Sequence, residues 1–224
     1  MMIRLSVYYL FLLLGVQCLA QSVSKTGTTA GQFLKIGVGA RAIAMGGAYS
    51  AVSNEASALY WNPAGLSRVD KNQLFLDHQD WVLDVDLDFA GALFKTPFGT
   101  VGAAISSMSM GEMEVTTSRF PDGTGEKFNA GSIMGQLTFS RELTDRFSFG
   151  ITGKIIRENI YNSRANGLAV DLGTLYETQI PGLMMGMSIS NYGTKMQMEG
   201  RDMLLQTEVD PSLESAPINI NANF

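Results

Sequence analysis

The chain has 224 residues, of which 46% are hydrophobic and only 17% are charged, where about 25% charged is usual for a soluble domain. It carries 16 basic and 21 acidic residues, a net charge of −5, and this balance argues against nucleic acid as a partner, because phosphate backbones are bound by clustered Lys and Arg. A single cysteine and a single histidine argue against a disulfide framework and against a zinc site.

Residues 1–20 are predicted to be a signal peptide. A basic residue precedes an apolar stretch, 5–16, and Cys18-Leu19-Ala20 forms a small-residue cleavage site. Acylation of Cys18 in a lipoprotein is the alternative, which Gln17 disfavours because such sites need a small residue there. The mature chain would therefore be exported and free of thiols.

Residues 21–70 are predicted to form a compact N-terminal segment that is too small for a core of its own. Its centre, 37–66, reads GVGARAIAMGGAYSAVSNEASALYWNPAGL. Ser53 or Asn54 can cap a short helix, and Pro63 ends that helix by forcing the preceding residue out of the helical region. We expect this segment to pack against the polar, small-residue face of the sheet that follows.

From residue 72 onward, apolar and polar residues alternate with period two, which indicates β-strands. Strands are predicted at 72–80, 85–95, 100–110, 128–140, 146–157, 167–177 and 182–191. Most reach the ~9 to 11 residues that a tilted strand needs to cross a bilayer. The apolar faces include Val85, Leu87, Phe89 and Leu93, then Ile151 and Ile155, then Leu168, Val170 and Leu172.

The connections are predicted to alternate between short ones (96–99, 142–145, 178–182) and long polar ones (111–127, 158–166, 193–217). Transmembrane barrels have short periplasmic turns and longer extracellular loops. A soluble antiparallel sandwich is the alternative, because its strands also alternate, but strand length and low charge disfavour it. The predicted fold is an all-β, antiparallel transmembrane β-barrel in the outer membrane.

Several motifs in the N-terminal segment resemble the signature of the PorV/PorQ family of outer-membrane proteins. They are Gly39-Ala40-Arg41-Ala42, Met45-Gly46-Gly47-Ala48, Ala51-Val52 and Trp61-Asn62-Pro63-Ala64-Gly65-Leu66. That family is similar to the FadL-type barrels that move long-chain fatty acids. The resemblance implies a barrel with an N-terminal hatch in its lumen, contact with outer-membrane lipid, and a role in type IX secretion with secreted cargo proteins and secretion-system subunits as partners.

The number of strands departs from this family. Seven strands cannot close a single-chain bacterial barrel, which has an even number, and an eighth is predicted at 218–224, where Ile218, Ile220, Ala222 and Phe224 alternate. An eight-stranded barrel is filled by its own side chains and cannot hold a hatch. We therefore expect residues 71–224 to be an incomplete barrel, the N-terminal portion of a longer protein.

The hatch residues predicted to have a structural or gating role are Arg41, Gly46, Gly47, Glu55, Trp61, Asn62 and Pro63. Arg41 would be costly to bury alone, so we expect it to pair with Asp171 or Glu55 and fasten the hatch to the wall, with direct gating as the alternative. No catalytic residue, metal or cofactor is predicted. Residues 37–42 have a glycine pattern like that of dinucleotide-binding sites, but such a site needs a βαβ unit and none follows.

Three further groups have structural interpretations. Asp84, Asp86 and Asp88 are spaced too widely along one strand to share a calcium ion and are predicted to line a solvated edge of the lumen. His78 is predicted to be an interfacial or loop residue. The five methionines Met184, Met185, Met187, Met196 and Met198 form a deformable cluster that binds apolar ligands or faces lipid.

Two functions remain open. The first is a secretion component that binds exported protein through its long surface loops. The alternative is a FadL-like passive channel for hydrophobic small molecules, in which the hatch moves.

Overall fold

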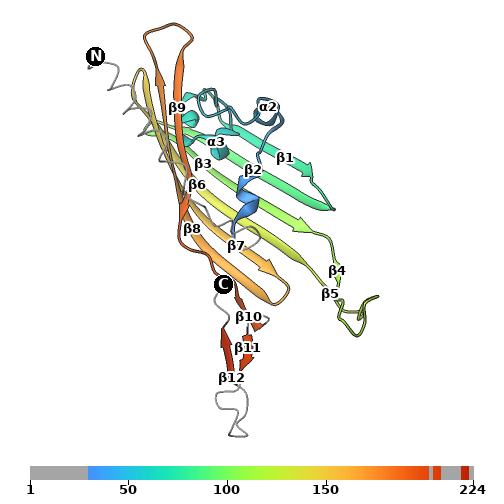
Figure 1. Ribbon diagram of the computed structural model, residues 1–224. Helices are drawn as coiled ribbons and strands as arrows, with labels where there is room; N and C mark the ends of the chain where they lie inside the picture. The colour runs from blue at the N-terminus through green and yellow to red at the C-terminus, as the bar shows by residue number, and fades with distance from the viewer. Residues whose placement is uncertain (1–29, 202–203, 208–217, 222–224) are drawn as a thin grey trace, which may run out of the picture.

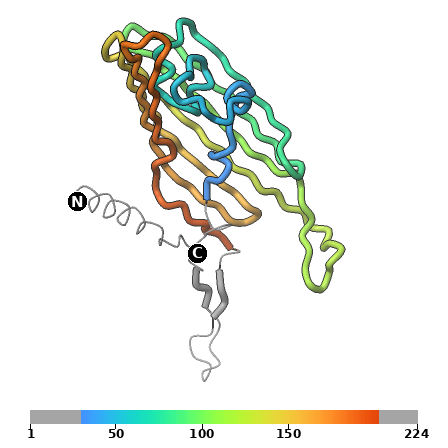
Figure 2. The backbone as a smooth tube through the Cα atoms, turned by 45° about the horizontal axis from the view of Figure 1, so that its top comes forward, coloured from blue at the N-terminus to red at the C-terminus, as the bar shows by residue number. Residues whose placement is uncertain are grey.

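The computed structural model describes residues 30–201, 204–207 and 218–221, and the predicted signal peptide lies outside this range. Residues 30–70, which we call the hatch, contain four short helical pieces: η2 (Gln32–Lys35), α2 (Ala40–Ala44), α3 (Ala58–Trp61) and η3 (Pro63–Arg68). Within the described residues no helix is long and apolar enough to cross a membrane. The remainder is mostly a large antiparallel sheet that curves around the hatch (Figures 1 and 2).

The sheet confirms all seven predicted strands. They are β1 (Gln73–Asp80), β2 (Val85–Thr96), β3 (Gly99–Met110), β6 (Ala130–Thr144), β7 (Phe147–Ile160), β8 (Ser163–Glu177) and β9 (Met184–Gly193). Neighbours in this order are hydrogen-bonded, and the short β10 (Glu199–Gly200) also pairs with β8. A hairpin of β4 (Met113–Glu114) and β5 (Lys127–Phe128) extends the connection between β3 and β6.

The predicted eighth strand does not join this sheet. Its described part, β12 (Ile218–Asn221), pairs instead with β11 (Leu204–Thr207), and residues 222–224 lie outside the described range. β11 is the nearest preceding strand in the chain, and closing a short loop costs less entropy than reaching a distant partner.

The predicted loop at 158–166 is wrong. β7 and β8 continue to a two-residue turn at Tyr161 and Asn162, where Tyr161 takes the left-handed conformation with φ 51°. The polar residues of this stretch are paired strand residues, with Asn159 opposite Arg164. The asymmetry of loop lengths is therefore weaker than predicted. The prediction failed because the polar residues at the ends of these two long strands have the composition that is typical of a loop.

The face of the sheet away from the hatch, its outer face, is apolar and exposed. Its large side chains, each between 40% and 72% exposed, form what we call the belt: Leu74, Leu76, Phe94, Val101, Ile105, Ile133, Leu137, Phe139, Ile151, Ile155, Leu168, Val170, Leu172, Met185, Met187 and Ile189. In β7, β8 and β9 the polar and small residues face the hatch, as predicted.

β2 has the opposite orientation, and here the predicted facing is wrong. Its apolar residues Val85, Leu87, Phe89 and Leu93 are buried on the hatch side, whereas Asp86 and Asp88 are exposed on the outer face and not on a lumen edge. The reason is the surface that the hatch presents at this point. Leu59 of α3 belongs to the same buried cluster as Phe89 and Leu93, so an apolar strand face is needed to cover it.

A second cluster lies further along the inner face. Phe33 and Leu34 of η2 pack with Met134, Ile156 and Ala169 of the sheet. The hatch thus has two apolar anchors on the wall, one at each end of its described length.

Candidate functional site

The inner face has a row of glycines where the hatch lies against it. A side chain at any of them would collide with hatch atoms: Gly91, Gly102, Gly150, Gly173 and Gly186. At Gly150, for example, a Cβ atom would lie only 2.5 Å from the backbone nitrogen of Ala64. None of the five has a positive φ, so these positions are glycine for space and not for conformation. We call this row the glycine seat.

Asn62 and Pro63 sit at the centre of the seat and are fully buried. The Asn62 amide nitrogen donates to the carbonyl of Ser50 at 2.7 Å and to that of Thr174 in β8 at 3.2 Å. Its Oδ1 accepts the backbone N–H of Ala64 at 3.1 Å and so caps η3. One side chain therefore links the hatch loop, the last hatch helix and the wall.

Gly46, Gly47 and Trp61 shape the hatch itself. Gly46 and Gly47 have φ of 65° and 76°, which other residues rarely adopt. The Trp61 indole N–H donates to the carbonyl of Val38 at 2.8 Å, and a Cβ at Gly47 would be 3.3 Å from its ring. The structure brings these predicted residues together as one fold of the hatch.

Arg41 contacts the hatch and not the sheet. Its Nη1 donates to Asn54 Oδ1 at 3.1 Å and lies 3.9 Å from Glu55 Oε2, and its guanidinium lies over the ring of Tyr49. Of the two predicted partners, Glu55 is the one observed, while Asp171 pairs with Lys154. The prediction that Arg41 fastens the hatch to the wall is therefore wrong. The Arg41 side chain is about half exposed, at 53%, so water solvates it and no carboxylate on the wall is required.

The ion pair that joins hatch to wall involves a different arginine. Arg68, the last residue of η3, places Nη1 2.9 Å from Glu177 Oε2 of β8. The sequence offered no signal for this pair, because the two residues are distant in the chain and neither stands in a recognisable motif.

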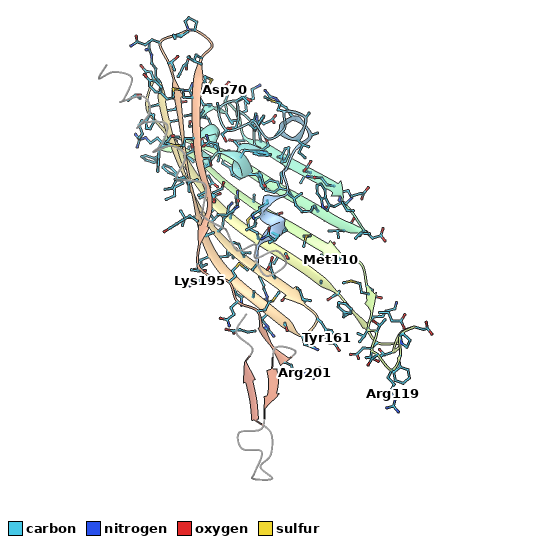
Figure 3. The ribbon with its side chains drawn as sticks, viewed as in Figure 1. Asp70, Met110, Arg119, Tyr161, Lys195 and Arg201 are labelled. Atoms are coloured by element: carbon cyan, nitrogen blue, oxygen red, sulfur yellow. The ribbon has the colours of Figure 1, made fainter. Side chains whose placement is uncertain are left out.

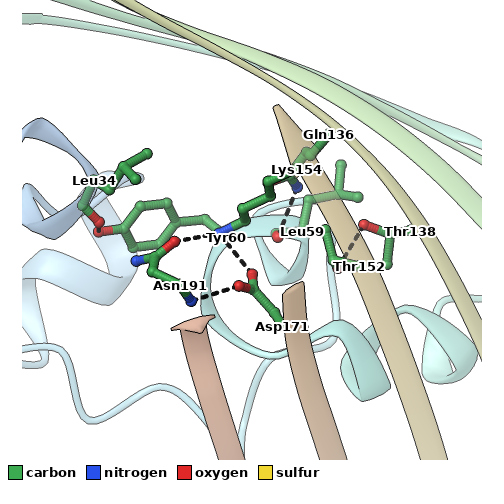
Figure 4. Close-up of polar contacts among 9 residues, drawn as sticks. All are labelled: Leu34, Leu59, Tyr60, Gln136, Thr138, Thr152, Lys154, Asp171 and Asn191. Atoms are coloured by element: carbon green, nitrogen blue, oxygen red, sulfur yellow. Dashed lines mark hydrogen bonds and ion pairs between the residues drawn. The ribbon is translucent and has the colours of Figure 1, made fainter. Parts of the chain in front are cut away.

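Lys154 and Asp171 form a buried ion pair on the inner face (Figure 4). Lys154 Nζ lies 2.6 Å from Asp171 Oδ2 and donates to Asn191 Oδ1 at 2.8 Å, and the Asn191 backbone N–H donates to Asp171 Oδ1 at 2.7 Å. Asn191 has φ 57°, and the β8–β9 register shifts at this point. Both charged side chains are at most 3% exposed, so removing either one would leave the other buried without a partner of opposite charge.

Tyr60, a hatch residue in α3, lies close to this pair (Figure 4). Its hydroxyl donates to the carbonyl of Leu34 at 2.9 Å. Burial, and secondly the charge of Asp171, raise the pKa of Tyr60 to about 12. The phenol is therefore a neutral donor throughout the physiological range.

A methionine-lined pocket of about 600 Å³ opens between η2 and the sheet. The methionines that line it are Met108, Met110, Met113, Met196 and Met198. The predicted methionine cluster is thus divided, because Met185 and Met187 are exposed on the outer face. A volume of this size is typical of small-molecule sites, and thioethers adapt to apolar ligands of varied shape.

His78 lies on β1 and is exposed. Its Nδ1 is 2.8 Å from Asp88 Oδ1 and its Nε2 is 3.3 Å from Asp80 Oδ1. The ligand atoms of His78, Asp80 and Asp86 lie within 4.8 Å of one another, a grouping made across two strands that spacing along one strand does not reveal. All of these side chains are well exposed, and the contacts of His78 with Asp80 and Asp88 give the group a structural explanation.

Comparison with known proteins identifies no family for this chain. No protein-family model matches the chain, and no curated protein matches it.

Proposed function

We propose that this chain forms the wall and hatch of an outer-membrane β-barrel of the PorV/PorQ kind, and that it handles secreted protein cargo together with secretion-system subunits. The observation that carries the proposal is the division between the two faces of the sheet. The outer face is an exposed apolar belt, and the inner face holds a buried ion pair under a close-packed hatch.

The height of the belt supports a membrane crossing. From Phe147 to Ile155 of β7, outward residues extend for about 27 Å along the strand. Strands tilted as in known barrels would convert this into about 20 Å across the membrane, near the ~25 Å apolar band of such proteins. The exposed aromatics Phe94, Phe98 and Tyr176 lie toward the end with short turns, where barrels carry aromatic girdles.

An exposed arm supports the cargo role. The 111–129 connection extends beyond the sheet as the β4–β5 hairpin, with Arg119 near its tip (Figure 3). Its residues are largely exposed, and such surface loops commonly carry binding functions on rigid scaffolds. We assign cargo contact to this arm.

A second candidate function rests on the methionine-lined pocket. A FadL-like channel would bind an apolar small molecule there and release it by moving η2, which forms one side of the pocket. In that case the arm would be dispensable and the pocket essential.

Replacing 115–126 by a short Gly-Ser linker separates the two functions. The secretion proposal expects this variant to remain in the outer membrane while cargo proteins accumulate in the periplasm. Met196→Glu, which places a charge in the pocket, is the matched variant and should leave secretion normal. Normal secretion without the arm, combined with lost uptake of an apolar compound in Met196→Glu, would favour the channel and refute the cargo role.

A further inference from the structure

The outer face carries a groove within the belt. It has a volume of about 560 Å³, and its walls include Ile105, Ile133, Ile155 and Leu168. Gly135 lies among them, and the groove is hollow at this point because glycine has no side chain. A Cβ at Gly135 would be 3.5 Å from Ile155 Cγ1, an ordinary contact, so packing does not force glycine at this position.

A cationic rim closes one end of the groove. Arg157 and Asn166 line it there and lie opposite each other in the β7–β8 register. Arg157 Nε donates to Asn159 Oδ1 at 3.4 Å, and its guanidinium forms no ion pair with a carboxylate in the described part of the chain. The neighbouring Glu158 instead accepts the N–H of Gly31 with its Oε1.

Other charges near the rim are arranged around Arg157. Lys195 (Figure 3) directly follows Thr194, another groove residue, and is exposed. Arg164 stands opposite Glu199 in the β8–β10 register, so its charge is partly offset. Arg157 lines the groove itself, and it and Lys195 are therefore the cations that an anion at this end would meet.

We propose that this groove binds one anionic phospholipid, with an acyl chain over Gly135 and the phosphate on Arg157 and Asn166. The inference rests on the proposed membrane location of the outer face. A guanidinium matches a phosphate with two parallel hydrogen bonds, and Arg157 stands where the apolar belt gives way to polar residues, which is the level of lipid headgroups. The apolar walls and the single cationic end match the two parts of such a lipid.

The test uses the purified full chain in detergent and native mass spectrometry with an equimolar mixture of phosphatidylglycerol and phosphatidylcholine of the same acyl chains. We expect the phosphatidylglycerol adduct to be favoured by on the order of fivefold, the effect of about one cation near an anionic headgroup. Arg157→Gln should abolish this preference. Gly135→Leu, which fills the groove, should lower the adducts of both lipids.

Two matched controls should behave as the unaltered chain. Arg141→Gln removes an exposed arginine at the far end of β6, and Gly153→Leu adds the same side chain at a belt position with open space around it. A preference for phosphatidylglycerol that persists in Arg157→Gln, or equal binding of inorganic phosphate with no effect of Gly135→Leu, would overturn the proposal. Flotation with liposomes tests membrane insertion separately: a chain that does not float refutes both proposals, and one that floats without lipid preference refutes only this one.

Discussion

Asn62→Ala tests how much the buried amide of Asn62 contributes to holding the hatch against the wall. The substitution removes three hydrogen bonds, to Ser50, Ala64 and Thr174, at a site with no solvent exposure. Each buried hydrogen bond contributes about 1 kcal/mol, and more where a partner is left unsatisfied. Only the bond to Thr174 crosses from the hatch to the wall, so the free energy of hatch release should fall by about 1 to 2 kcal/mol, which raises the released population roughly 10-fold.

Trp61 reports this release. The chain has two tryptophans, so Trp81→Phe leaves Trp61 as the only emitter, and its emission should shift to the red as the hatch leaves the sheet. Titration with urea in detergent then gives the free energy of release for each variant. Asn54→Ala, which removes an exposed hydrogen bond to Arg41, is the matched control and should change it by less than about 0.5 kcal/mol. An Asn62→Ala variant as stable as this control would refute the role given to Asn62.

Three further predictions use the same titration. Gly173→Val should destabilise the seated hatch by about 3 kcal/mol through overpacking, while Gly153→Val, on the open outer face, should not; equal effects would contradict the glycine seat. Lys154→Met should cost about 3 to 5 kcal/mol because Asp171 is left buried and unpaired, and adding Asp171→Leu should recover most of it; no recovery would contradict the buried ion pair. The pKa of Tyr60 is raised to about 12, so its contribution is fully present below pH 10 and is lost as pH rises from 10 to 12. Tyr60→Phe should abolish that loss, and an unchanged alkaline profile would refute the assignment.

The strands could be predicted from the sequence because alternation is a local pattern. All seven were located to within a few residues, and in β7, β8 and β9 the predicted facing is confirmed as well. The facing of β2 could not be predicted, because it depends on which part of the hatch covers it. Period two fixes which residues share a face but not which of the two faces is covered.

The sequence allowed the residues of the candidate site to be predicted better than the contacts that they make. Gly46, Gly47, Trp61, Asn62 and Pro63 all have structural roles in the hatch that follow from their residue types. The partners of charges were not predictable, because pairs such as Lys154–Asp171 and Arg68–Glu177 form across strands and between segments distant in the chain. Arg41 was predicted to be buried and paired because its neighbours in sequence are apolar, but those neighbours do not bury its side chain.

The central claim is that the belt faces lipid, and a lipid-quenching measurement tests it most directly. The single cysteine lies at position 18, so the chain from residue 21 onward accepts a unique label. A fluorophore on Leu137→Cys, in the belt, should be quenched strongly by phospholipids with brominated acyl chains and weakly by aqueous iodide. The same label on Arg119→Cys, at the exposed arm, should show the reverse. If the Leu137 site is quenched by iodide as readily as the Arg119 site and is insensitive to brominated lipid, the outer face is exposed to water and the account of a membrane barrel is wrong.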